Sequence, residues 1–85
     1  MKHVCYVLYS HKHEKIYIGY TSNLIGRFKS HNELGTKGFT VRYRPWIIAH
    51  LEFFELKLEA TSREKQLKSS RGRAWIRSEV LPKYQ

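Results

Sequence analysis

Three apolar segments separated by polar ones form the framework of the chain. Residues 4–9 are rich in β-branched and aromatic side chains and predict a strand with two apolar faces, which suits the centre of a sheet. A polar segment, residues 10–15, precedes the apolar residues 16–19, so this region predicts a β-hairpin with a loop of about six residues. A third strand is expected over residues 46–54, because this segment is long and strongly apolar.

The hairpin also predicts which side chains meet. If its loop is symmetric, Leu8 faces Tyr17, and Tyr6 lies one diagonal away on the same face, within reach of a long side chain. A slip of one residue in the pairing would separate the two phenols. The pattern therefore favours two neighbouring tyrosines on one face of the sheet.

Helical patterning occupies the rest of the chain. A helix is predicted over residues 22–32, followed by a glycine-containing basic loop over residues 33–44. A second helix is expected over residues 56–69 and a final short one over residues 74–81, before Pro82. These elements predict one α/β domain, residues 1–85, with a small three-stranded antiparallel sheet flanked by helices in the order β-β-α-β-α-α.

Composition narrows the class of protein. The net charge is +9, from 16 Lys and Arg against 7 acidic residues, which favours a polyanion such as nucleic acid as partner. The apolar runs are shorter than the roughly 20 residues that span a bilayer, and the N-terminus lacks a secretory pattern, so we expect a soluble, cytoplasmic protein without a membrane partner. Cys5, the single cysteine, lies in an apolar run and is expected to be a buried thiol.

The acidic residues carry a sharper exclusion. All seven are glutamates, and the chain has no aspartate. Nucleases and phosphatases that hold two metal ions between clustered carboxylates usually need aspartates at several fixed positions. The chain therefore lacks the aspartates on which two-metal sites usually depend.

Two polar residues of the first helix border its apolar stripe. At about 100° per residue, Leu24, Phe28 and His31 fall nearly on one line, with Arg27 about 60° to the side. In one interpretation, Arg27 runs along the edge of the core and His31 interacts with the carbonyls at the helix end. In the other, Arg27 binds a phosphate, which a guanidinium matches closely.

Glu64 is the clearest violation of the pattern, because it falls within the arc of Leu56, Ala60 and Leu67 on the second helix. A carboxylate there must be paired or must bind a cation. Pairing with Arg27, or locally with Arg63 or Lys68, is one interpretation. The other is a single divalent metal held by Glu64, water and substrate phosphate, because Mg²⁺ often keeps much of its water.

Two tyrosines and a series of basic residues complete the set of candidate functional residues. Tyr6 and Tyr17, taken singly, are typical of half-buried core residues with a hydroxyl at the rim. A basic series is interleaved with aromatic residues, a pattern that fits a nucleic-acid surface and equally a solvated face. The predicted contacts are Lys37, Arg42, Arg44, Lys65, Lys68, Arg71 and Arg73.

Taken together, these residues resemble the GIY-YIG endonuclease superfamily, and more closely its small single-domain bacterial branch, which is related to the nuclease domain of a bacterial excision-repair endonuclease. The motifs are Tyr17-Ile18-Gly19, the helix with Arg27 that ends at residues 29–32, and the downstream segment 62–68 around Glu64. The chain departs from the family pattern at residues 4–6, which read Val-Cys-Tyr in place of Gly-Ile-Tyr, and it lacks the Asn that follows the glutamate in several members.

The resemblance implies a role for each residue. Tyr17 is similar to the tyrosine proposed to activate the attacking water, and Tyr6 to the supporting tyrosine of the first signature. Arg27 matches the arginine that neutralises the scissile phosphate, Glu64 the single metal-binding glutamate, and His31 an auxiliary position. One metal and one arginine would then take the place of the missing aspartates.

The leading expectation is therefore a Mg²⁺- or Mn²⁺-dependent endonuclease that hydrolyses DNA. A phenol has an unperturbed pKa near 10, so Tyr17 can act as a base only if a nearby cation stabilises its phenolate or a relay removes its proton. Two alternatives remain: a basic nucleic-acid-binding module without catalysis, and a nuclease that acts only with a larger protein partner. The preference for DNA over RNA rests on the resemblance, because charge and aromatic residues suit either.

Overall fold

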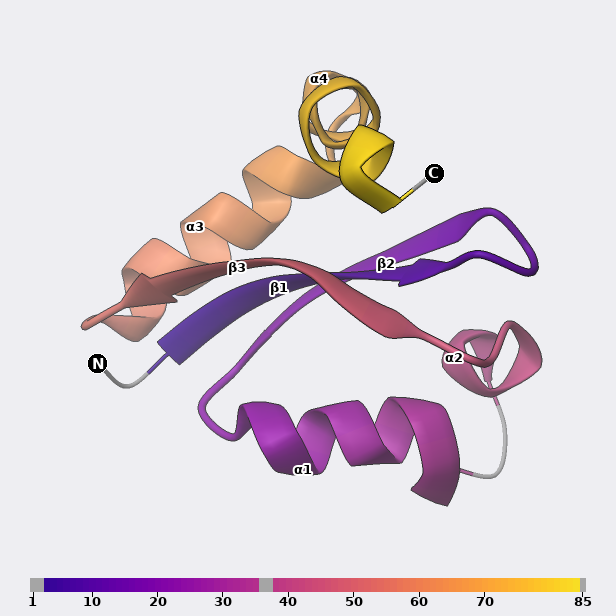
Figure 1. Ribbon diagram of the computed structural model, residues 1–85. Helices are drawn as coiled ribbons and strands as arrows, with labels where there is room; N and C mark the ends of the chain where they lie inside the picture. The colour runs from indigo at the N-terminus through magenta and orange to yellow at the C-terminus, as the bar shows by residue number, and fades with distance from the viewer. Residues whose placement is uncertain (1–2, 36–37, 85) are drawn as a thin grey trace.

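A central strand with partners on both sides forms the sheet. The computed structural model describes residues 3–35 and 38–84. In it, β1 (His3–Ser10) pairs antiparallel with β2 (Lys15–Thr21) and with β3 (Ile47–Phe54), which gives the order β2-β1-β3 (Figure 1). The predicted three-stranded antiparallel sheet and the central position of β1 are confirmed. The hairpin loop is shorter than predicted, because pairing extends to Ser10 and Lys15.

The register of the hairpin agrees with the prediction. Leu8 pairs with Tyr17, and Tyr6 pairs with Gly19. The rings of Tyr6 and Tyr17 lie on the same face of the sheet, with their centroids 6.3 Å apart. The two phenols are therefore neighbours.

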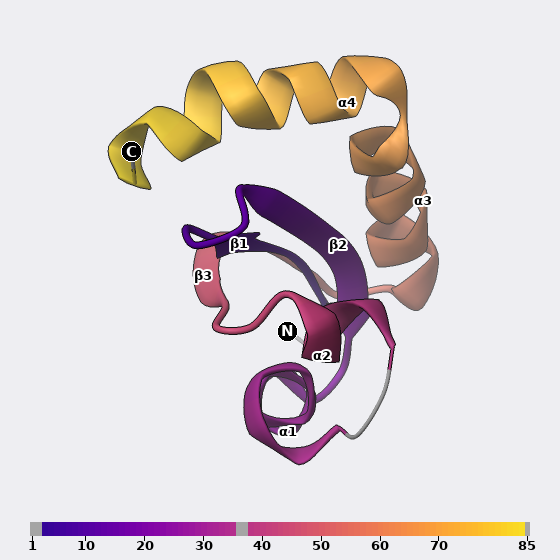
Figure 2. The same ribbon diagram turned by 90° about the vertical axis from the view of Figure 1, so that its right-hand side faces the viewer.

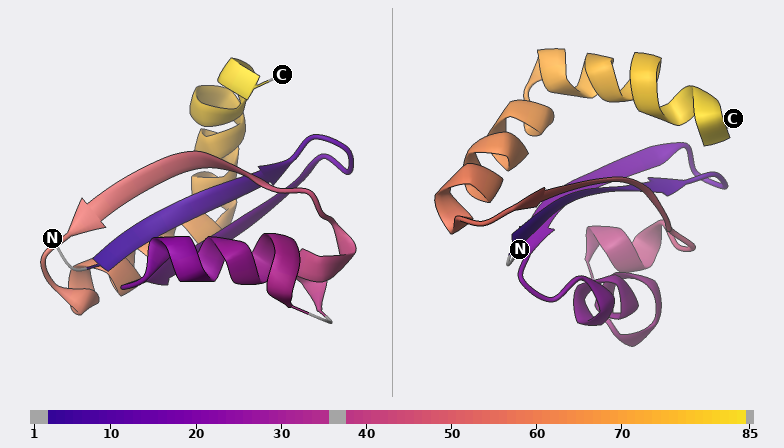
Figure 3. Two further views of the ribbon diagram at one scale, coloured as in Figure 1. Left: turned by 60° about the horizontal axis from the view of Figure 1, so that its bottom comes forward. Right: turned by 60° about the vertical axis from the view of Figure 1, so that its left-hand side comes forward.

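Helices cover both faces of the sheet, and the alternation of side chains along β1 divides the core into two parts (Figures 1 and 3). On one face, Cys5, Val7 and Tyr9 pack under α3 (Lys57–Lys68), α4 (Ser70–Trp75) and the turns that follow them. The buried thiol predicted for Cys5 is confirmed. The larger core lies here, and its helical members are Leu67, Ile76, Val80 and Leu81.

The smaller core lies on the opposite face, where α1 (Leu24–Lys29) crosses the sheet (Figure 3). Tyr6, Leu8 and Trp46 are buried there, and Leu24 and Phe28 pack against them. The Oδ1 atom of Asn23 accepts a hydrogen bond from the amide of Gly26 at 3.1 Å, so α1 begins at Leu24, later than predicted. It continues as a wider π-helical turn, Ser30–Leu34.

A short helix in the segment predicted as a loop is a correction to the sequence analysis. Helix α2 (Phe39–Arg42) lies beside the end of α1. Trp46 stabilises it, because the indole Nε1 donates a hydrogen bond of 2.7 Å to the carbonyl of Thr40. This contact comes from the residue just before β3, outside the helix, so the helix's own pattern did not indicate it.

The C-terminal segment is longer than predicted. Ser69 accepts a hydrogen bond from the amide of Gly72, and α4 therefore starts at Ser70 instead of residue 74. The chain continues helically through Ile76–Val80 and Leu81–Tyr84. Pro82 is tolerated because it lies in the first turn of the last segment, where an N–H is not required.

Helix α3 differs from its predicted pattern at one position. Ala60 and Leu67 are buried as expected, but Leu56 precedes the helix and is 61% exposed. Among residues 3–35 and 38–84, no helix combines the length and apolar character that crossing a membrane demands.

Candidate active site

A cavity of about 490 Å³ at the end of β2 collects the residues that the sequence analysis connected with hydrolysis. Tyr6 comes from β1, Tyr17 from β2, Arg27 from α1 and Glu64 from α3. Helices α1 and α3 lie on opposite faces of the sheet (Figure 1). Arg27 and Glu64 therefore reach the cavity from opposite faces. Its other lining residues are His3, Gly19, Tyr20, Thr21, Ser22 and Lys57.

Gly19 is required by the packing of Tyr6. A Cβ atom at position 19 would lie 2.6 Å from the Tyr6 hydroxyl oxygen and 2.8 Å from its ring carbon Cζ. Both distances are shorter than any ordinary carbon contact, so a side chain there would displace the phenol. The glycine of Tyr17-Ile18-Gly19 thus makes room for the first tyrosine.

His31 joins the site beside the two phenols. Its Nε2 lies 2.9 Å from the Tyr6 hydroxyl in a buried hydrogen bond, and its ring centroid is 4.8 Å from that of Tyr17. Burial raises the pKa of Tyr6, while burial and then the charge of Arg27 lower the pKa of His31. The phenol therefore keeps its proton and donates a hydrogen bond to a neutral imidazole.

Arg27 supplies the positive charge of the cavity. Its guanidinium lies beside both phenols, and hydrogen bonding to Tyr6 raises the pKa of Arg27 further above its already high value. The side chain is largely exposed, so it borders the cavity and can meet a ligand that arrives from solvent. A guanidinium in this position matches the oxygens of a phosphate.

Glu64 is partly buried, with 19% of its side chain exposed. Its Oε2 lies 3.3 Å from the ammonium of Lys68, one turn further along α3, which is one of the pairings considered from the sequence. Arg63 pairs instead with Glu52 of β3, at 2.8 Å. A pair of this kind, four residues apart on a helix, contributes only about 0.3–0.5 kcal/mol, so a stronger ligand can displace the lysine.

The donor set fits a hydrated hard cation. Among the described residues, no three His, Cys, Asp or Glu side chains gather into one group, so a closed metal site of the zinc type is not formed there. Mg²⁺ keeps several waters and is often held by one or two carboxylates together with substrate phosphate. Glu64, at the wall of an open cavity that also contains Arg27, provides that arrangement.

Two basic lining residues, Lys57 and His3, were not among the residues predicted from the sequence. Lys57 lies seven residues before Glu64, and this spacing places both on one face of α3, a signal that the pattern did contain. His3 lies at the start of β1, and its Nδ1 is buried without a hydrogen-bond partner in the part of the chain that the structure describes. No sequence pattern indicated its position.

Arg44, predicted to contact nucleic acid, has a structural role. Its guanidinium donates hydrogen bonds to the carbonyls of His31, Ser30 and Gly35, at 2.7, 3.2 and 2.8 Å. These carbonyls end the first helix, which otherwise leaves them without partners. A contact between Arg44 and nucleic acid stays a prediction.

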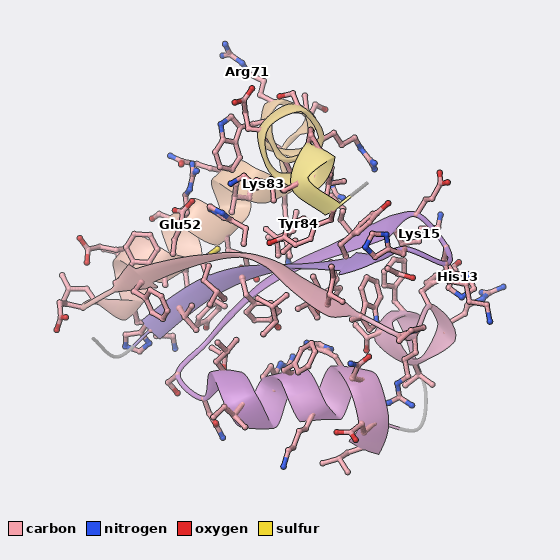
Figure 4. The ribbon with its side chains drawn as sticks, in the orientation of Figure 1. His13, Lys15, Glu52, Arg71, Lys83 and Tyr84 are labelled. Carbon is pink, nitrogen blue, oxygen red and sulfur yellow. The ribbon has the colours of Figure 1, made fainter. Side chains whose placement is uncertain are left out.

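The other predicted nucleic-acid contacts are dispersed. Lys68 and Arg73 line one groove, which also includes Tyr17 and Phe39. Arg42 lines a separate cavity beside Tyr43. Arg71 extends from the outer side of α4, away from the sheet (Figure 4). Lys65 is exposed on α3, and Lys37 lies outside the described residues.

A comparison with known protein families shows to which family the chain belongs. A model described as the GIY-YIG catalytic domain matches residues 2–77. The chain belongs to the GIY-YIG family. This is a nuclease-type family.

Other GIY-YIG proteins of small size are similar to the chain. A UPF0213 protein of Clostridium perfringens is 42% identical over 57 residues, which cover 67% of this chain and 61% of the relative. A UPF0213 protein of Staphylococcus haemolyticus is 34% identical over 80% of this chain and 82% of its own length. The chain thus aligns with less than two thirds of the first relative.

A solved structure supports the fold. The solution NMR structure of the UPF0213 protein BH0048 from Bacillus halodurans aligns with a TM-score of 0.55 and 28% identity. The alignment covers 92% of this chain and 84% of the other. The three-stranded antiparallel sheet flanked by helices is therefore shared with an experimental structure.

Proposed function

We propose that the chain is a divalent-metal-dependent endonuclease that hydrolyses phosphodiester bonds in DNA. The observation that carries the proposal is the convergence of Tyr6, Tyr17, Arg27 and Glu64 on one open cavity. Four different elements supply these residues, and they are the residues that match the GIY-YIG pattern. Such convergence is unexpected for polar residues with only local packing roles.

Tyr6 and His31 form a ready path for a proton. The phenol donates to Nε2 at 2.9 Å, so its oxygen can accept a proton from water as its own proton passes to the imidazole. No free phenolate is needed, which matters because the pKa of Tyr6 is raised. The sequence analysis gave the role of base to Tyr17; we assign proton transfer to Tyr6 and His31, and orientation of the water to Tyr17.

Arg27 and Glu64 act on the phosphate. Arg27 neutralises the charge that develops on the phosphoryl oxygens as water attacks. Glu64 would hold the Mg²⁺ or Mn²⁺ ion, which when bound polarises the phosphate and stabilises the leaving oxygen. Lys57 and Lys68 lie on the same side of α3 and add positive charge next to the carboxylate.

The test is cleavage of labelled single-stranded, nicked and branched DNA with Mg²⁺ or Mn²⁺. We expect wild-type protein to cut at least one of these substrates, and Glu64→Gln to lower the rate by at least about 100-fold, a loss typical for a principal electrostatic contributor. Glu79→Gln is the matched control, because Glu79 is an exposed carboxylate on the C-terminal segment. It should cut at the wild-type rate.

A second readout separates metal binding from catalysis. Mn²⁺ should broaden the amide NMR signals of residues near Glu64 in the wild-type protein, and Glu64→Gln should abolish this broadening. If Glu64→Gln cuts as fast as the wild type, the proposal fails. Salt-sensitive DNA binding without any cleavage would instead support the basic, non-catalytic module.

A further inference from the structure

A groove of about 380 Å³ lies next to the candidate active site, along the free edge of β2. Figure 2 shows this edge between α2 on one side and α3 with α4 on the other. The groove is lined by Ile16, Tyr17, Ile18, Phe39, Lys68 and Arg73. Tyr17 lines both hollows, so they lie on either side of one side chain.

We propose that this groove binds the nucleotide next to the scissile phosphate, with its base stacked on Phe39 and its phosphate held by Lys68 and Arg73. The inference rests on the proposed function and names its substrate more closely: a strand with an unpaired, unstacked base beside the cleavage position. Phe39 plays no part in the proposed hydrolysis.

Phe39 has the properties of a stacking platform. It is 46% exposed, although it belongs to an aromatic cluster. Its ring centroid lies 4.8 Å from that of Tyr43, 6.2 Å from Tyr17 and 6.1 Å from Trp46. These neighbours hold the ring in place, and nearly half of the side chain stays accessible. An exposed, rigid aromatic ring can stack with any base.

Two cations on the opposite wall complement a phosphate. Lys68 is 46% exposed and already neutralises Glu64 at 3.3 Å, which places its ammonium between the cavity and the groove. The Nε atom of Arg73 donates a hydrogen bond of 3.1 Å to the backbone carbonyl of Lys68. That bond uses only Nε and holds the guanidinium beside Lys68 at the groove that both residues line. An aromatic ring facing two cations is the combination that single strands require.

The arrangement selects against an intact duplex. A base inside a duplex is paired and stacked on both faces, so it cannot lie against Phe39 while its phosphate lies in the cavity. Moving the base out would cost a few kcal/mol of unpairing and unstacking. A strand that is already single, frayed or mismatched at this position avoids that cost.

The test is equilibrium binding in EDTA, which prevents cleavage and so does not depend on the catalytic proposal. Fluorescence anisotropy would compare a labelled single-stranded oligonucleotide with the same strand in a full duplex. We expect Phe39→Ala to weaken single-strand binding at least about fivefold, the smallest loss typical of a missing stacking contact, and to leave duplex binding within about twofold. Phe39→Trp should retain single-strand affinity.

Matched variants separate stacking from stability. Phe53 is a similarly exposed phenylalanine on β3, and Phe53→Ala should bind like the wild type. Phe39→Leu keeps an apolar side chain but lacks a π face, so it should bind single strands as weakly as Phe39→Ala. Lys68→Gln and Arg73→Gln should each lower the slope of log K against log salt by about 0.7.

The inference is overturned if Phe39→Ala or Phe39→Leu binds the single strand as tightly as the wild type. It is also overturned if both variants lose as much affinity for the duplex as for the single strand. A protein that cuts DNA and yet shows either of these results would refute the stacking site alone. A protein that stacks a single strand on Phe39 and does not cut any DNA would refute the proposed hydrolysis alone.

Discussion

At the scale of a single residue, His31 is both buried and in contact with the two tyrosines of the candidate site. It is only 5% exposed, forms a hydrogen bond with Tyr6 and lies against the ring of Tyr17. The helical pattern placed it on the apolar stripe but could not show its partner, because Tyr6 lies 25 residues earlier. Its neutral state follows from burial and from the nearby charge of Arg27, which both lower the pKa of the imidazole.

The lowered pKa of His31 predicts a pH dependence of stability. The unfolded chain takes up this proton near the ordinary pKa of 6.5, whereas the folded chain resists it. The unfolded state then binds more protons, so the free energy of unfolding should fall as the pH drops below about 6.5. Urea denaturation between about pH 7 and pH 5 should show this fall in the wild type and a flatter dependence in His31→Gln.

His11→Gln is the control, because His11 is exposed in the hairpin loop. It should preserve the dependence of the wild type. If His31→Gln loses as much stability on acidification as the wild type does, His31 is not the group responsible.

At the scale of elements, Arg44 connects the end of the first helix to the start of β3. Its three hydrogen bonds to backbone carbonyls are reinforced by Asn32, whose side chain accepts from the Trp46 amide at 2.7 Å and donates to the Trp46 carbonyl at 3.0 Å. The strand and the helix end are thereby fixed together.

Replacing Arg44 with alanine should therefore destabilise the fold. Loss of the guanidinium leaves partly buried carbonyls without partners, and we expect a decrease of about 1.5–3 kcal/mol in the free energy of unfolding. Arg42→Ala, which removes an exposed guanidinium two residues earlier, should change it by less than about 0.5 kcal/mol. Equal urea midpoints for the two variants would contradict the structural role of Arg44.

These elements also show what a sequence pattern can predict. The strands and the register of Leu8 and Tyr17 were predictable because alternation and a short loop are local features. Helix α2 was not, since four residues gain their stability from Trp46 and not from their own pattern. The role of Arg44 was missed for a similar reason: charge alone does not distinguish a cation that binds nucleic acid from one that caps a helix.

The candidate site was predictable to the extent that its residues violate local patterns. Glu64 and Arg27 were recognisable because charged side chains bordered apolar stripes. Lys57 and Phe39 gave weaker signals, since an exposed lysine on a helix and an aromatic residue in a loop are both ordinary. Only the tertiary arrangement of α2, α3 and β2 brings them to the two hollows.

On the scale of the whole molecule, two cores of unequal size stabilise the sheet. The larger depends on the C-terminal segment, whose Ile76, Val80 and Leu81 are all buried. Tyr84 adds a hydrogen bond of 3.1 Å to the carbonyl of Ala49 and lies against the sheet (Figure 4). The last helical turns are therefore part of the domain core.

Leu81→Ala tests this dependence. Because Leu81 is 1% exposed, truncation should leave a cavity and lower the free energy of unfolding by about 2–5 kcal/mol. Leu56→Ala makes the same chemical change at an exposed position and should cost less than about 1 kcal/mol. Chemical denaturation of both variants measures the difference, and a small loss in Leu81→Ala would show that the C-terminal turns are dispensable.

The division of the candidate site between the two layers has one more consequence. Both tyrosines, Arg27 and His31 precede the end of β3, whereas Glu64 belongs to the helix that follows it. Neither segment holds the full set of groups, so a nascent or clipped chain would carry an incomplete site. The proposed hydrolysis would therefore begin only after the last third of the chain has been made and folded onto the rest.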